Sequence, residues 1–486
     1  MLSSVHNHGD IVLNDPTIPS SVHALLSHFS RCFTKCGFAN FVALATGWLF
    51  CQGRHSISRV IQAGCDSDER RHHSCFYRFL SVGKWATDSI GEVLFQLLLP
   101  LLPQCVTAMV DDTLSCKNGP HIFGAAMHFD ASRSTYGRGT TAGRKKFFAF
   151  GHNWVVLSVW LPLPWGASRG MAIPVLFRLY RSKKNCPKTQ YHKRTEFAFE
   201  LVNILSGWLP EGRKLSVVGD SEYACKTLVR NLSKNQVFTG PMSMDAALFD
   251  EPGPYAGRGR KPKKGRRLPS PAQLIAMRSV PWEELTLTIY GKEVTILVKT
   301  QICLWFTVAE ERKVRMVVTR DPSGRMGDRA YFTTDHERSV TDLLTEFARR
   351  WEIEVAFRNA KQAMGLEDPQ NGWWRRKKGT PRPKKKAGPN PRGRKGETAV
   401  NHTLALSFAA YAIVVIWYLK HGQMEKDVKR VRKEAPWYRR KVAPSYADMV
   451  AAVRRELWGE RFSRNPLLRP VTKKIRELLP HWLLAS

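Results

Sequence analysis

The chain has 486 residues, and its 76 Lys and Arg outnumber its 41 Asp and Glu, which gives a formal charge of +35. Such an excess of positive charge is typical of proteins that bind a polyanion, usually nucleic acid. Hydrophobic residues make up 43% of the chain, which argues against the short, apolar-poor basic proteins of ribosomes and chromatin. The length and composition indicate a globular protein of about three domains.

The N-terminal part is predicted to be helical. Residues 1–20 are polar and contain two prolines, and we expect them to be flexible. Apolar residues then follow helical spacing through 21–104, which predicts a helical DNA-binding domain. Arg54 and Arg59 flank the start of a candidate recognition helix, where they would contact bases or phosphates. The alternative is an ordinary helix start capped by Ser56.

Two short apolar runs end in acidic residues. One begins at Val106 and ends at Asp111 and Asp112, and the other begins at Leu215 and ends at Asp220. Both runs are predicted to be buried strands. Catalytic groups in α/β sheets gather beyond the carboxyl ends of strands. The alternative for each Asp is a turn former or a helix cap.

A later segment, 347–366, is predicted to be a helix that presents Phe347, Arg350, Glu354 and Lys361 on one face. On that face the carboxylate is flanked by two cations. The acid can hold a metal ion while the bases hold phosphate oxygens. The alternative is a surface helix with ion pairs between its side chains.

The order Asp112, Asp220, Glu354 resembles the DDE triad of insertion-sequence transposases, which have a ribonuclease-H-like core. The resemblance covers roughly residues 20–420. It implies that the three acids bind two Mg²⁺ ions, or Mn²⁺ in their place, for in-line phosphoryl transfer. Asp111 is the competing candidate, since neighbours on a strand face opposite sides. The family pattern has the ligand immediately before the Thr, which favours Asp112.

The helix resembles the Tyr-(2)-Arg-(3)-Glu-(6)-Lys signature of the insertion-sequence-four superfamily. Arg350, Glu354 and Lys361 match at the family spacing, whereas Phe347 stands at the Tyr position. The Phe lacks the hydroxyl that helps to hold DNA in the family, so that contact is not expected here. The resemblance implies that Arg350 and Lys361 position DNA phosphates, and Arg358 on the same helix is a further DNA-binding candidate.

The catalytic domain is expected at 105–423. The fold predicted is mixed α+β, with a ribonuclease-H-like core, a helical N-terminal domain and an inserted β subdomain. After the first acidic strand, the apolar patterns predict strands and then a helix, with strands at 123–129, 147–161 and 172–180, a helix at 195–209 and a strand at 236–239. Helices are expected on both faces of the sheet.

The segment between the second and third acids is too long for a loop, so 243–335 is predicted to be a β-rich insertion. Its strand-like runs are 282–290, 293–299, 303–308 and 315–320. Similar family members use a Trp in such an insertion to stack on a flipped base, and Trp305 and Trp282 are the candidates. The alternative for both is packing in a β core.

A basic, Pro- and Gly-rich loop is expected at 372–397, beside the active site, where it would grip flanking DNA. The candidate DNA contacts nearest the helix are Arg375, Arg376, Lys377 and Lys378. The alternative is a solubilising tail. Residues 424–486 are predicted to be a basic helical region, for which the sequence indicates no role.

The predicted function is cleavage and strand transfer at the terminal inverted repeats of an insertion sequence, with DNA ends and target DNA as partners and a homodimer as the active form. The alternatives are a ribonuclease-H-like nuclease without strand transfer and a noncatalytic DNA-binding protein derived from a transposase. No signal peptide is expected, and the apolar run 404–419 is short for a membrane span. We therefore expect a bacterial cytoplasmic protein, associated with the nucleoid when bound to DNA, with no membrane partner.

Overall fold

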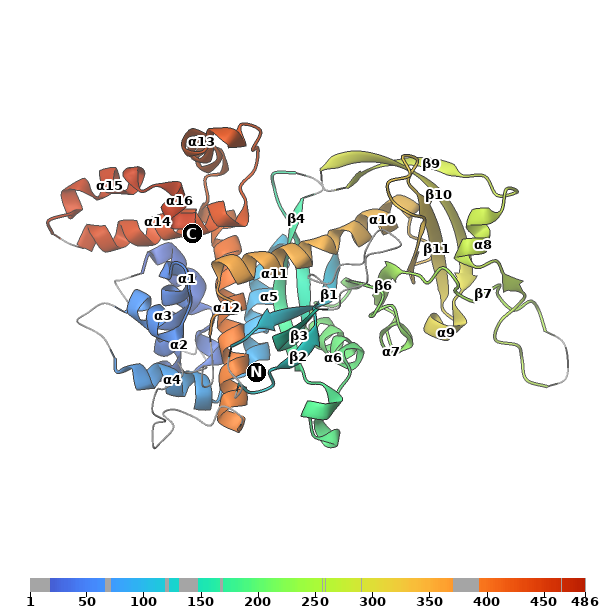
Figure 1. Cartoon of the computed structure of the whole chain (residues 1–486), viewed down its shortest axis with the longest axis horizontal. Coiled ribbons are helices and arrows are strands. Elements are labelled where there is room, and N and C mark those ends of the chain that lie inside the picture. Colours follow the sequence, from blue (N-terminus) through green and yellow to red (C-terminus); the bar gives the residue numbers. More distant parts are fainter. Residues whose placement is uncertain are drawn as a thin grey trace, which may run out of the picture.

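The computed structural model describes residues 18–65, 71–118, 122–130, 147–166, 169–255, 257, 259–289, 291–369, 393–464 and 466–485. These residues form one long sheet with helices packed around it (Figure 1). The mixed α+β class predicted from the sequence is therefore confirmed.

The described residues form a sheet of twelve strands in the order β2-β3-β1-β5-β6-β12-β11-β10-β7-β8, with β4 paired to β3 and β9 paired to β10. Strand β1 is antiparallel to β3 and parallel to β5, and β5 is parallel to β6. The strands that carry the core are β1 (Cys105–Cys116), β2 (Ala126–Phe129), β3 (Phe148–Pro162), β4 (Gly170–Tyr180), β5 (Lys214–Gly219) and β6 (Gln236–Pro241).

The β-rich segment expected at 243–335 continues this sheet. Its last strand pairs antiparallel with β6, with Thr333 opposite Thr239. Residues 303–308, predicted as a strand, form the end of a longer strand and a short helix, because the chain must reverse there to pair antiparallel with β11. The elements are β7 (Leu248–Phe249), β8 (Arg267–Leu268), β9 (Glu283–Ile289), β10 (Lys292–Leu304), α9 (Phe306–Ala309), β11 (Lys313–Arg320) and β12 (Arg329–Thr333).

Helices precede, interrupt and follow the strands. The N-terminal helices are α1 (Ser20–Ser27), α2 (Lys35–Phe50), α3 (Ile57–Gly64), α4 (His73–Val82) and α5 (Thr87–Leu98). Within and after the sheet come α6 (Arg194–Trp208), α7 (Lys226–Val229), α8 (Pro271–Ala276), α10 (Val340–Arg349) and α11 (Trp351–Ala363). The C-terminal helices are α12 (Arg394–His421), α13 (Met424–Glu434), α14 (Tyr446–Arg464), α15 (Thr472–Leu478) and α16 (His481–Ala485).

Helix α12 stands between the N-terminal helices and the sheet (Figure 1). It packs against α2, α4, α5 and β4, and also against α14. It is long and apolar enough to cross a membrane, but 94% of its apolar window is buried inside the molecule. The side chain of His402 stacks on Trp85 with ring centroids 3.6 Å apart and bonds to the Trp85 carbonyl at 3.0 Å. The apolar run 404–419 is thus covered by protein on all sides of the helix.

Close packing of α2 on α3 generates a prediction about stability. A Cβ at Gly47 on α2 would lie 2.1 Å from the carbonyl oxygen of Val60 on α3, so Gly47→Ala must push the two helices apart. We expect the free energy of unfolding to fall by about 1–3 kcal/mol, as for other overpacked cores, measured by urea denaturation. Gly207→Ala is the control: its Cβ meets no atom within 4 Å in α6, so stability should stay level or rise by less than about 1 kcal/mol. Equal stability of the two variants would contradict the close approach.

Candidate functional site

The two acids lie within β1 and not at its end as predicted, because the strand continues to Cys116 in its antiparallel pairing with β3; they directly follow its parallel pairing with β5. Val106 to Val110 are fully buried, and Asp111 and Asp112 are the first partly exposed residues that follow. Because alternate residues of a strand face opposite sides, the two carboxylates point away from each other. The parallel register pairs Val110 with Gly219 of β5, so the next residues along the two strands are Asp111 and Asp220.

Asp111 faces the helix that carries Glu354. Nη1 of Arg350 donates to Oδ2 of Asp111 at 3.1 Å and lies 2.9 Å from Oε1 of Glu354. One guanidinium therefore joins the first strand to α11. The negative charge of Asp220 raises the pKa of both Asp111 and Arg350. The structure brings Asp111, Asp220 and Glu354 to one face, around Arg350.

Two consecutive helices, rather than the single helix predicted, carry the signature residues. α10 ends at Arg349 and α11 begins at Trp351, with Arg350 between them in right-handed helical geometry (φ −52°, ψ −34°). The two helices run almost in line (Figure 1). Phe347 lies in the last turn of α10, where its ring packs 4.7 Å from that of Tyr331 on β12.

Asp112 faces α6 instead. Its Oδ2 accepts from Nδ2 of Asn153 at 2.6 Å and from Nη1 of Arg194 at 3.1 Å. Nε of the same Arg194 donates to Glu222 at 2.7 Å. The sequence favoured Asp112 over Asp111 as the acid that joins the other two. In the structure the opposite holds for orientation, because a one-residue step along β1 turns the side chain toward α6.

Asp220 also shapes its own turn. Its Oδ1 accepts from the backbone N–H groups of Glu222 and Tyr223, at 2.9 and 3.4 Å. This is the turn-forming role considered as the alternative for a strand-end Asp. The role holds the residue in place just beyond β5, and it occupies one of the two carboxylate oxygens.

The donor atoms of this face are of the type that Mg²⁺ and Mn²⁺ prefer. Burial raises the pKa of Asp111 well above its usual range; Arg350 opposes that shift, and Asp220 and Asp112 add to it. In this structure the compensating positive charge comes from Arg350. Across the part of the chain that the structure describes, no three His, Cys, Asp or Glu side chains lie close enough to hold a metal ion. The carboxylates suit such an ion by atom type and charge, and in this structure Arg350 bridges Asp111 and Glu354.

The other predicted DNA contacts are spread over the molecule. Nζ of Lys361 donates to the carbonyl of Leu114 at 2.6 Å and lies 3.6 Å from Glu367, so it ties α11 to β1. Arg358 is exposed on α11. Arg375, Arg376, Lys377 and Lys378 lie outside the described residues.

Helix α3 begins where the candidate recognition helix was expected. Arg54 and Arg59 are both exposed there, and Ser56 caps the helix by accepting from the N–H of Arg59 at 3.4 Å. The cap and the DNA-binding role are compatible, since the cap leaves both guanidinium groups in solvent.

Trp305 is the predicted contact that the structure argues against. Its side chain is only 7% exposed and packs edge-on against Phe332, with ring centroids 5.0 Å apart. A ring buried in that way cannot stack on a base. Trp282 lies between Lys299 and Arg320, with their charged groups 4.6 and 4.5 Å from its ring. Packing, the alternative interpretation of both residues, accounts for these contacts.

Sequence reasoning passed over the residues that surround Asp112. Arg194 begins α6, Asn153 lies on β3, and Glu222 follows the second acid. Arg194 and Asn153 belong to no short motif, whereas Glu222 lies in the Gly-Asp-Ser-Glu run at 219–222, which was the one available signal. Only the tertiary structure joins the three residues.

Comparison with protein families gives two matches. Residues 28–293, more than half of the chain, match the family described as DDE superfamily endonuclease. Residues 307–381 match the family described as archaeal putative transposase ISC1217. The first match contains the strand-end acids, and the second contains Arg350 and Glu354. A DDE endonuclease domain is ribonuclease-H-like, so the predicted core fold is confirmed. No curated protein sequence matches the chain.

The bridge made by Arg350 predicts a pair of stability measurements. Arg350→Gln leaves Asp111 mostly buried without its cation, and we expect a loss of about 3 kcal/mol in the free energy of unfolding. Adding Asp111→Asn should restore most of that loss, because no buried charge is then unpaired. Urea denaturation in EDTA gives both values. An equal loss in the single and the double variant would mean that Arg350 stabilises the fold by other contacts.

Proposed function

Because the chain belongs to the DDE superfamily of endonucleases, we propose that it is an insertion-sequence transposase that cuts DNA at the terminal inverted repeats of its element and joins the freed ends to target DNA. The two family matches support the coarser statement, a nucleic-acid-cleaving enzyme of the transposase kind. The observation that carries the finer proposal is the bridge from Arg350 to Asp111 on β1 and Glu354 on α11, with Asp220 close enough for its charge to act on both Asp111 and Arg350.

The proposed catalytic acids are Asp111, Asp220 and Glu354. Support comes from the parallel register that sets Asp111 beside Asp220, from the ion pairs of Arg350 with Asp111 and Glu354, and from the charge of Asp220, which acts on Arg350. Asp112 is proposed as a positioning residue, since its Oδ2 is occupied by Asn153 and Arg194.

DDE enzymes generally use divalent metal ions, and we propose Mg²⁺ or Mn²⁺ held by the three acids. When bound, the metal would activate the attacking oxygen and stabilise the leaving one. The protein contributes the placement of the carboxylates. We propose that Arg350 exchanges its carboxylate partners, Asp111 and Glu354, for a DNA phosphate when DNA binds. Guanidinium groups pair as well with phosphate as with carboxylate.

DNA is the proposed partner, with contacts from exposed Arg54, Arg59 and Arg358 and from the basic loop at 372–397. The formal charge of +35 supports contacts with many DNA phosphates along an extended surface. A homodimer is proposed because two element ends must be cut and joined together. Such an enzyme would act in the bacterial cytoplasm, associated with the nucleoid when bound to DNA.

Cleavage of a plasmid that carries the DNA flanking the gene tests the assignment. With Mg²⁺ we expect cuts at the element boundaries. Asp111→Asn and Glu354→Gln should each reduce cutting at least about a hundredfold, because each removes a proposed metal ligand. The matched control Asp112→Asn should keep cutting within about tenfold of the parent protein. Asn has nearly the same size as Asp, and its amide oxygen can still accept a hydrogen bond from Arg194 or Asn153.

Joined products with intact protein would separate the transposase from a nuclease that only hydrolyses. Loss of cutting in Asp112→Asn but not in Asp111→Asn would reverse the assignment of the two neighbours. If all forms bind the ends equally and none cuts, the protein is a noncatalytic DNA-binding protein.

A further inference from the structure

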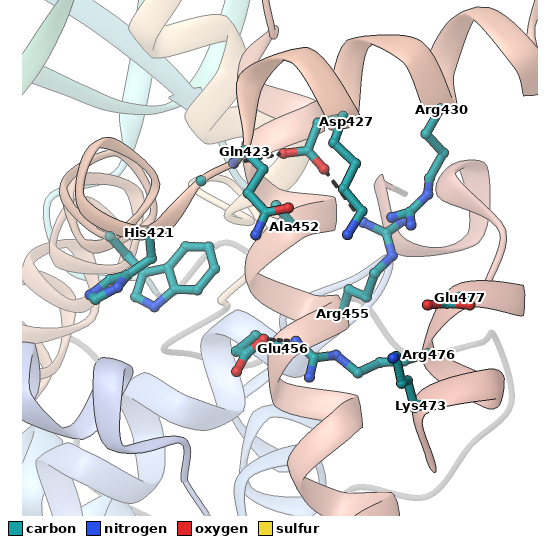
Figure 2. Close-up of a pocket in the computed structure, with 13 residues that line it drawn as sticks. His421, Gln423, Asp427, Arg430, Ala452, Arg455, Glu456, Lys473, Arg476 and Glu477 are labelled. Carbon is teal, nitrogen blue, oxygen red and sulfur yellow. Dashed lines mark hydrogen bonds and ion pairs between the residues drawn. The ribbon is translucent and has the colours of Figure 1, made fainter. Parts of the chain in front are cut away.

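A cavity of about 240 Å³ lies among the C-terminal helices, between the end of α12 and helices α13, α14 and α15 (Figure 2). We call it the C-terminal pocket. Three Asp and Glu side chains line it, against a larger number of basic ones, namely Lys426, Arg430, Arg455, Lys473 and Arg476. The pocket belongs to a region, 424–486, to which neither the sequence nor the proposed catalysis assigns a role.

Arg455 is the most unusual residue of the pocket. It is only 7% exposed, and its Nε and Nη2 have no hydrogen-bond partner among the described residues. Its nearest carboxylate oxygen, Oδ1 of Asp427, is 4.0 Å from Nη1. The other oxygen of Asp427 accepts from the hydroxyl of Tyr418 at 2.8 Å and from the N–H of Gln423 at 3.3 Å. A buried guanidinium with two unsatisfied N–H groups is costly, and native structures rarely keep one without a ligand.

A second guanidinium increases that cost. The side chain of Arg430 on α13 extends toward that of Arg455 on α14 (Figure 2). Burial and, after it, the charge of Arg430 lower the pKa of Arg455 to about 10, although the charge of Asp427 opposes the shift. Glu456, the acid on the same helix as Arg455, is paired with Arg476 and so does not offset the repulsion between Arg430 and Arg455.

The remaining cations leave the pocket positive. Lys426 and Lys473 are exposed at its edge and make no ion pair within the described part of the chain. Five Lys and Arg thus face three Asp and Glu, of which Glu456 is engaged by Arg476 and Asp427 by Tyr418. The unsatisfied N–H donors of Arg455 and the excess positive charge would both be compensated by an anion with several acceptor oxygens.

We propose that the C-terminal pocket binds a phosphate group, with Arg455 and Arg430 as the donors. Guanidinium groups present paired N–H donors that match phosphate oxygens. The phosphate comes either from the DNA backbone or from free phosphate in solution. This site lies on different elements from the acids around Arg350, and it does not depend on the proposed catalysis.

The first experiment measures thermal unfolding of the full chain with increasing inorganic phosphate, at constant ionic strength and without divalent metal. Phosphate should raise the Tm of the parent protein, because a ligand that binds only the folded state stabilises it. Arg430→Gln should weaken the phosphate response at least about tenfold in concentration, as expected for the loss of a charged hydrogen-bond donor. The matched control is Lys429→Gln, which removes the same charge from an exposed position of α13 outside the pocket and should respond like the parent.

Binding of duplex DNA over a salt series distinguishes the two sources of phosphate. If a backbone phosphate occupies the pocket, the salt slope for Arg430→Gln should fall by about one, and that for Lys429→Gln should fall by less. If free phosphate is the ligand, the Tm response is lost in Arg430→Gln while the salt slopes of the two variants agree. Either result supports the phosphate site.

The proposal is overturned if phosphate raises the Tm of Arg430→Gln as much as that of the parent and the two variants bind DNA alike. Arg455→Met provides a second variant should Arg430→Gln not fold. Replacing a buried, poorly paired Arg by an apolar side chain of similar length is expected to leave stability without phosphate unchanged or higher, while the phosphate response is lost. Because no cleavage is measured, failure of this proposal is separate from failure of the catalytic one.

Discussion

The guanidinium of Arg350 holds the candidate site together. It lies at the junction of α10 and α11, and its Nη1 contacts Asp111 on β1 and Glu354 on α11 at 3.1 and 2.9 Å. Without a cation there, carboxylates from three elements would repel one another in partly buried surroundings, where charges interact more strongly than in water. The ion pair therefore keeps α11 seated against β1 and holds the acids near one another.

The continuous sheet explains how acids far apart in sequence meet. Strands β1 and β5 are parallel neighbours whose pairing ends at Val110 and Gly219, so the next residues, Asp111 and Asp220, lie beside each other. The β-rich segment extends the sheet from β6 and returns through β12 to the start of α10. The chain thus passes through the β-rich segment before it forms α11, which carries Glu354. Helix α12 supports the arrangement by packing between the sheet and the N-terminal helices.

The half-buried Arg350 and the buried Arg455 illustrate opposite electrostatic situations. Arg350 has carboxylate partners within 3.1 Å, and burial is offset by them. Among the described residues, Arg455 has a carboxylate only at 4.0 Å, a neighbouring Arg430, and two N–H groups without a partner. The first arrangement is complete within the protein, and its site is defined by acids. The second is incomplete within the described chain, which is why we infer an external anion.

The sequence by itself determined the buried strand segments that precede the acids, the helical spacing of Arg350 and Glu354, and the basic character of the chain, because these depend on short-range periodicity and composition. It also indicated the ribonuclease-H-like core through a family resemblance. Only the tertiary structure decided that Asp111 turns toward α11 and Asp112 toward α6, that Trp305 is buried, and that Arg455 has no close partner in the part of the chain that the structure describes. Each of these depends on which layer packs against a residue, and a step of one residue along a strand exchanges one layer for the other.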